Sequence, residues 1–168
     1  MIRKKRPLLD WPVKPLKIYW EAYGGWTALF RSGFFWFSLW VSLICNVFMT
    51  DSFSWHEMAI SILPDLLGFS LGGYVIMVGF GDVEFLNALR GRTEDSPSTY
   101  MKMNAAFVHF LVVQTTTLFL AIFCEALGMT DIVSTSVGMF LLFYTVGTLF
   151  AAIFNVLNVS NWYDQKPK

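Results

Sequence analysis

The chain has 168 residues, of which 55% are hydrophobic and only 14% are charged, and its mean hydropathy is +0.53. Soluble domains usually carry about a quarter charged residues, so this composition excludes an ordinary soluble domain and predicts a membrane protein. The formal net charge is zero, and direct contact with nucleic acid is therefore not expected. Cys45 and Cys124 lie singly within apolar runs, where they predict neither a metal site nor a disulfide framework.

Residues 1–32 are expected to form a basic leader followed by an interfacial helix. Trp and Tyr are interspersed with Lys and Arg between positions 11 and 31, as they are in helices that lie in the headgroup layer. An aromatic linker is the alternative, and Gly24-Gly25 is a candidate break in the helix. No small-residue cleavage site lies near the end of the first apolar run, so we interpret that run as a retained span rather than a signal peptide.

Four apolar stretches predict four membrane-spanning helices, because each approaches the ~20 residues that cross a bilayer. The first is the shortest and needs flanking residues to reach that length. We therefore expect an all-α integral membrane protein that forms a single membrane domain. The predicted spans are 33–50, 58–80, 103–127 and 132–156.

The segments outside the spans carry most of the charge. Residues 81–102 are expected to form a short cytoplasmic amphipathic helix and a polar loop, and 157–168 a cytoplasmic tail. All 12 Lys and Arg residues lie in the leader, in 81–102 or in the tail. The positive-inside rule then places both termini in the cytoplasm, and we expect the inner membrane of a bacterium. The basic residues proposed to contact lipid or a soluble cytoplasmic partner are Arg3, Lys4, Lys5, Arg6, Arg90 and Arg92.

The second span carries a row of small and acidic residues at alternating spacings of four and three. This spacing keeps them on one face of a helix that supercoils slightly left-handed around its neighbours. Glycine on such a face lets another backbone approach closely, because packing joins helices in lipid. We therefore expect this face to meet other protein, most simply copies of the same chain. Its members are Ser61, Asp65, Gly68, Gly72, Val75, Gly79 and Asp82, and all of them except Val75 are small or acidic.

Asp65 has two interpretations. A carboxylate deep in a span costs roughly 2.5–3.5 kcal/mol on insertion scales, and such groups face a cavity, a pore or a partner. If the helix begins near Pro64, Asp65 is instead a first-turn acid, which the helix dipole favours. Glu125, near the outer end of the third span, has the same two interpretations.

The fourth span repeats the four-three row, and the third span carries a polar arc of its own. These faces either pack against other helices or line an aqueous path, and the pattern alone leaves both open. His109 and Thr116 share a different side of the third span. The polar arc of the third span comprises Asn104, Gln114, Thr115 and Glu125, and the fourth-span row comprises Ser134, Gly138, Leu141, Thr145, Thr148, Ala152 and Asn155.

His56 and His109 are the residues that invite a catalytic or metal-binding interpretation. Neither has a second helical His at the spacing of a metal site, and no cysteine pair or nucleophile motif accompanies them. A single membrane His more often packs or forms hydrogen bonds. We therefore expect neither an enzyme nor a bound cofactor.

Together these patterns favour a small homo-oligomeric channel or membrane-permeabilising effector that is gated from the cytoplasmic side. In architecture alone, the chain resembles the compact multi-span membrane components of bacterial anti-phage defence systems, and no motif residue carries that similarity. One alternative is a non-conducting scaffold or sensor subunit that docks a soluble cytoplasmic partner. Another is a proton-coupled transporter that uses Asp65 or Glu125.

Overall fold

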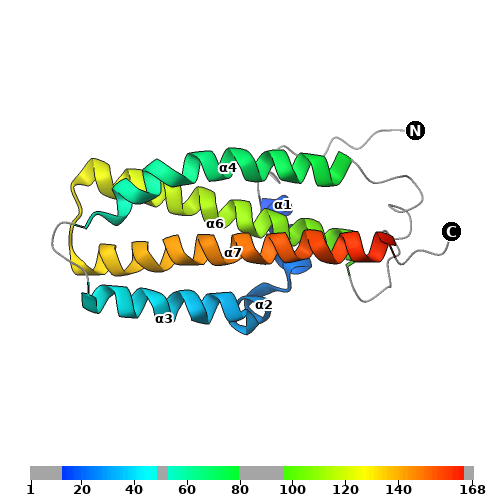
Figure 1. Cartoon of the computed structure of the whole chain (residues 1–168), viewed down its shortest axis with the longest axis horizontal. Coiled ribbons are helices and arrows are strands. Elements are labelled where there is room, and N and C mark those ends of the chain that lie inside the picture. The colour runs from blue at the N-terminus through cyan, green and yellow to red at the C-terminus, as the bar shows by residue number, and fades with distance from the viewer. Residues whose placement is uncertain (1–12, 49–52, 80–96, 165–168) are drawn as a thin grey trace.

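The computed structural model describes residues 13–48, 53–79 and 97–164, of which 92% are helical and none is in a strand. These parts of the chain form a bundle of helices (Figure 1), and the expected all-α class is confirmed. In chain order the helices are α1 (Val13–Tyr23), α2 (Gly25–Arg31), α3 (Gly33–Phe48), α4 (Trp55–Gly79), α6 (Thr99–Leu127) and α7 (Ile132–Asp164).

The long helices pack side by side. Helix α3 packs along α7, α7 along α6, and α6 along α4 (Figure 1). The turn between α6 and α7 lies at the same end of the bundle as the start of α4 and the end of α3. Helix α1 packs against α6, and α2 packs against α3. The N-terminal helical segment is therefore attached to the bundle through two different helices.

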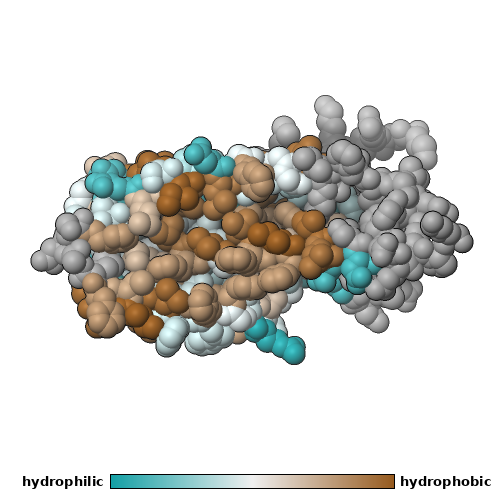
Figure 2. Space-filling view, viewed as in Figure 1, coloured by the Kyte–Doolittle hydropathy of each residue, from teal (hydrophilic) through white to brown (hydrophobic). Residues whose placement is uncertain are grey.

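Three of the described helices, α4, α6 and α7, are long and apolar enough to cross a membrane. Helix α3 has 16 residues, short of the ~20 that cross a bilayer. It has the required length and composition only together with α2, from which it is bent by 56°. Apolar side chains cover much of the outer face in Figure 2, as expected of a surface that contacts lipid. The apolar spans are Trp55–Val75, Thr99–Leu127 and Ile132–Asn158.

Helix α4 begins earlier than predicted, at Trp55. The hydroxyl of Ser54 accepts a hydrogen bond from the amide of Glu57 at 3.2 Å, which satisfies one of the unpaired donors of the first turn. Pro64 therefore lies inside the helix, and the alternative of a helix that begins near Pro64 is wrong. Asp65 is consequently an acid within the helix and not a first-turn residue.

Two further boundaries also differ from those predicted. Helix α6 begins at Thr99, because the Ser98 side chain accepts a hydrogen bond from the amide of Met101 and caps the helix. It ends at Leu127, and Gly128 caps it with a φ of 62° in the left-handed region. Helix α7 continues past its predicted end to Asp164, so the first part of the predicted tail is helical.

The N-terminal helical segment is broken at Gly24 and Gly25, as predicted. Their φ angles are 103° and 62°, in the region that glycine adopts at little steric cost. A β-carbon at Gly24 would also lie 3.0 Å from that of Ala28. The break lets α1 and α2 take different directions. Outside the described residues lie the predicted helix within 81–96, Asp82, Arg90, Arg92 and the leader residues Arg3, Lys4, Lys5 and Arg6.

Two clusters of buried apolar side chains hold the long helices together. The larger includes residues of α4, α6 and α7 and contains Trp55, whose side chain is 2% exposed. Gly138 of α7 faces the Trp55 indole so closely that an added β-carbon would overlap the ring. The smaller cluster joins Phe107 and Phe110 of α6 to Ala152 of α7. The core therefore lies along the contacts of α6 with α4 and α7.

Candidate functional site

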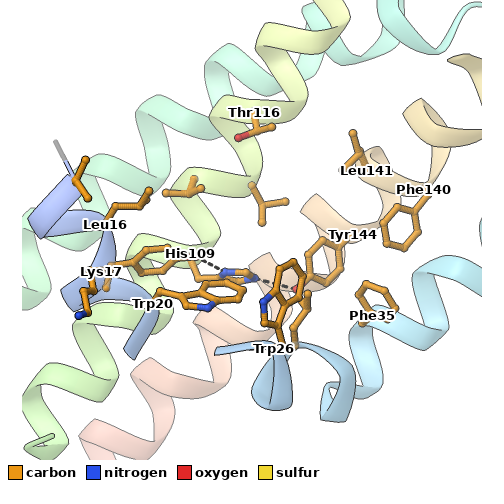
Figure 3. Close-up of a pocket in the computed structure, with 15 residues that line it drawn as sticks. Leu16, Lys17, Trp20, Trp26, Phe35, His109, Thr116, Phe140, Leu141 and Tyr144 are labelled. Carbon is orange, nitrogen blue, oxygen red and sulfur yellow. Dashed lines mark hydrogen bonds between the residues drawn. The ribbon is translucent and has the colours of Figure 1, made fainter. Parts of the chain in front are cut away.

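A buried histidine connects three helices. This histidine is His109 of α6, which is 6% exposed. The Nδ1 atom of His109 lies 2.6 Å from the hydroxyl of Tyr19 in α1, and Nε2 lies 2.8 Å from the hydroxyl of Tyr144 in α7 (Figure 3). The ring of Tyr23 stacks on the imidazole, with the ring centroids 3.9 Å apart. We call these four residues the histidine cluster.

Both ring nitrogens of His109 form hydrogen bonds to tyrosine hydroxyls. A neutral imidazole has one donor and one acceptor nitrogen, so the two tyrosines bonded to it have opposite roles. Both hydrogen bonds therefore stabilise the neutral form of His109. Burial also raises the pKa of Tyr23, which keeps this neighbouring hydroxyl protonated at neutral pH.

The Tyr19 hydroxyl is a stable donor. Burial, and then the neighbouring Tyr23, raises the pKa of Tyr19 to about 12, so Tyr19 keeps its proton at neutral pH. With Tyr19 on Nδ1 and Tyr144 on Nε2, both ring nitrogens of His109 are engaged. The arrangement is suited to holding α1 against α6 and α7.

Sequence analysis identified His109 but missed its tyrosine partners. Tyr19 and Tyr23 are four residues apart and share one face of α1, and this spacing is the signal that the sequence offers. Nothing in the sequence indicates that this face lies against α6. His109 and Thr116, which were predicted to share one side of the third span, both line one cavity.

That cavity has a volume of about 630 Å³ and lies beside the histidine cluster. Its volume is within the usual range of small-molecule sites. The walls combine Trp20 of α1, Trp26 of α2, Phe35 of α3 and Phe140 of α7 with aliphatic residues of α6 (Figure 3). Lys17 of α1 is the charged residue among those that line it. An apolar chamber with a cation at its edge therefore lies between the N-terminal helices and the bundle.

A second polar contact lies at the other end of the bundle. His56, near the start of α4, is 7% exposed, and its Nδ1 forms a hydrogen bond with the carboxyl group of Glu125, near the end of α6. The hydroxyl of Ser54 lies 3.1 Å from the same nitrogen. The Glu125 side chain is 49% exposed. Sequence analysis identified His56 and Glu125 separately, and the packing of α4 along α6 brings them together.

The fourth-span row faces the interior of the bundle. Thr145 is fully buried, and its hydroxyl lies 3.1 Å from that of Thr117 in α6. Gly138 is covered by Trp55. These residues pack α7 against other helices of the same chain, which agrees with the helix-packing interpretation. Ser134, Thr148 and Asn155 of this row are also buried or half-buried.

The second-span row faces outward. Ser61 and Asp65 are exposed, and a β-carbon added at Gly68 or Gly72 would meet no atom within 4 Å. In the most apolar stretch of α4 only 17% of residues are buried, compared with 39% in α6 and 44% in α7. Of these three helices, α4 is therefore the least covered by the rest of the described chain. The surroundings of Gly79 lie outside the described side chains.

The residues of the polar arc of the third span differ in burial, some lying in the interior and others on the surface. Gln114 is fully buried and donates through Nε2 to the hydroxyl of Ser70 at 3.4 Å. Its Oε1 has no hydrogen-bond partner among the described residues. Thr115 and Glu125 are exposed, and Thr115 donates to the carbonyl of Leu111 at 2.8 Å. Asn104 is half-buried.

Comparisons with protein-family models, with curated proteins and with solved structures found no match for this chain. Its class therefore rests on its fold, which is all-helical with three helices apolar enough to cross a membrane. These helices indicate a membrane protein. Within the described residues, no three His, Cys, Asp or Glu side chains gather as metal ligands.

Proposed function

We propose that the chain is a small homo-oligomeric membrane channel whose subunits meet along the outward face of α4. The observation that carries this proposal is the exposure of Asp65 within an apolar span. An ionised carboxylate that faces acyl chains costs roughly 2.5–3.5 kcal/mol on insertion scales. Contact with a second subunit, or with water that the subunits enclose, removes this cost.

The glycines beside Asp65 support the same arrangement. Gly68 and Gly72 have open space over their α-carbons, so a helix of another subunit can approach the α4 backbone closely. The matching row on α7 is not free for this role, because Thr145 and Thr148 are already buried within the chain. We therefore place α4 nearest the symmetry axis.

The proposed topology has four spans, with α2 and α3 together forming the first, broken span. We place both termini on the cytoplasmic side, because the distribution of Lys and Arg favours that orientation. In this topology α1 is the interfacial helix, and the histidine cluster links it to α6 and α7. A cytoplasmic partner that pulls α1 away would act directly on two spans, which is our proposed route for gating.

Ion flux from proteoliposomes tests conduction. Asp65→Asn keeps the shape of the side chain and removes its charge, and Glu57→Gln is a matched control because Glu57 is an exposed acid in the first turn of the same helix. We expect Asp65→Asn to lower cation flux by about tenfold or more and Glu57→Gln to leave it unchanged. An assembled wild-type protein that carries no flux contradicts the channel and favours the scaffold.

A proton-coupled transporter is the second candidate, and the His56–Glu125 pair favours it. This pair joins two spans through two titratable groups, as proton-coupled carriers require. It predicts substrate-dependent proton uptake that Glu125→Gln abolishes, whereas passive ion flux persists in that variant. Passive flux without proton uptake in the wild-type protein contradicts the transporter.

A further inference from the structure

We propose that the cavity beside the histidine cluster binds one acyl chain of an acidic glycerophospholipid, with the lipid phosphate at Lys17. The inference depends on the location of the bundle in a membrane. It requires neither oligomerisation nor conduction, so it can succeed or fail independently of the proposed channel.

The chemistry of the walls selects an apolar occupant. Trp20, Trp26 and Phe140 present aromatic rings to the cavity. Tyr19, His109 and Tyr144 also line the cavity, and the two tyrosines already engage both nitrogens of His109. A ligand that needs hydrogen bonds from His109 would have to break those bonds. A flexible hydrocarbon chain fits without doing so.

The surroundings of the cavity indicate that it opens toward lipid. Leu16 and Trp26, which both line the cavity, are 59% and 64% exposed. Exposed apolar side chains at the edge of an apolar cavity are stable beside acyl chains and unfavourable beside water. Tryptophan is also enriched at the boundary between headgroups and acyl chains. An acyl chain can therefore enter sideways from the bilayer.

The positive charge at the edge of the cavity favours a lipid with an anionic headgroup. Helices α1 and α2 contain the cations Lys14, Lys17 and Arg31 and the single acid Glu21. The Nζ atom of Lys17 lies 3.7 Å from the Glu21 carboxylate, and both side chains are mostly exposed. Exposed pairs of this kind contribute little stability. A phosphate can therefore bind Lys17 in place of Glu21 or together with it. Phosphate groups attract basic residues at the membrane surface in the same way.

Native mass spectrometry of protein extracted from vesicles of phosphatidylglycerol and phosphatidylcholine tests the site. Val112→Trp fills the cavity from α6, since Val112 lines it and is 38% exposed. Ile122→Trp is the matched control on the same helix, because Ile122 is 52% exposed and lies outside the cavity lining. Lys17→Glu tests the headgroup, and Lys14→Glu makes the same charge change outside the lining. Circular dichroism confirms that each variant is folded.

The wild-type protein is expected to retain one phosphatidylglycerol in preference to phosphatidylcholine. Val112→Trp should lower the retained fraction at least about fivefold, and Ile122→Trp should not. Lys17→Glu should abolish the preference for phosphatidylglycerol, and Lys14→Glu should keep most of it. Equal retention by the two Trp variants, equal effects of the two Glu variants, or retention of detergent alone would each overturn the proposal.

Discussion

The hydroxyl of Tyr19 lies 2.6 Å from Nδ1 of His109, although the two residues are 90 positions apart in the chain. This contact connects the first described helix to α6. On its other side, the same imidazole contacts Tyr144 of α7. One side chain therefore couples the position of α1 to the packing of α6 and α7, and a change that releases α1 leaves a buried nitrogen without its partner.

Tyr19→Phe is expected to loosen α1. The substitution leaves Nδ1 of His109 unsatisfied, and an unsatisfied buried group costs about 1–3 kcal/mol. Trypsin should then cleave after Lys17 roughly fivefold faster or more. Cleavage after Lys102, which is exposed near the start of α6, serves as the internal reference and should not change. Equal cleavage rates after Lys17 in the wild-type protein and in Tyr19→Phe would show that the Tyr19–His109 hydrogen bond does not hold α1.

Alkaline pH should release α1 through the same tyrosine. The pKa of Tyr19 is about 12 in the folded protein and about 10 when unfolded. Because the folded pKa is raised, the contribution of Tyr19 is fully present below pH ~10 and is lost as the pH rises through ~12. The pKa of Tyr23 is also raised and acts in the same direction.

Tyrosinate absorbance and tryptophan fluorescence should follow this alkaline transition, since Trp20 lies beside Tyr19 in α1. Tyr19→Phe should remove the Tyr19 component of the absorbance change. A wild-type protein in which all tyrosines titrate near pH ~10 would be incompatible with a half-buried Tyr19 that is hydrogen-bonded to His109.

Gly138→Ala should destabilise the bundle. The new β-carbon would overlap the Trp55 indole, and forced overpacking of this kind typically costs about 1–3 kcal/mol. Gly33→Ala is the control, because nothing lies within 4 Å of a β-carbon there. Thermal unfolding in detergent measures both variants.

A smaller residue at position 55 should relieve the effect of Gly138→Ala. The double variant with Trp55→Leu should therefore be more stable than the sum of the two single changes predicts. Strict additivity of the two changes would indicate that Gly138 and Trp55 do not pack together.

The two four-three rows illustrate how far sequence alone could go. Their spacing correctly placed Gly138 and Thr145 on one helical face, and Asp65 and Gly68 on another. It could not distinguish inward from outward, because both rows combine small and polar residues at the same intervals. The direction is set by residues distant in sequence, such as Trp55, which fills the space over Gly138.

The two histidines show the same limit differently. His56 and Glu125 lie at helix ends that an antiparallel arrangement of consecutive spans brings together, so their contact could have been predicted from the expected topology. The contact of His109 with Tyr19 could not, because it depends on the direction that α1 takes relative to α2 at the break at Gly24. Local sequence encodes that break through glycine but not the direction that follows it.

The central claim is that the outward face of α4 meets copies of the same chain, and disulfide crosslinking in native membranes tests it most directly. In a background with Cys45→Ala and Cys124→Ala, Gly68→Cys and Gly72→Cys should form disulfide-linked dimers, since close backbones bring α-carbons within about 7 Å. Phe69→Cys should not, although Phe69 is 78% exposed on the same helix. Equal crosslinking at 68 and 69, or monomers alone, would contradict the account.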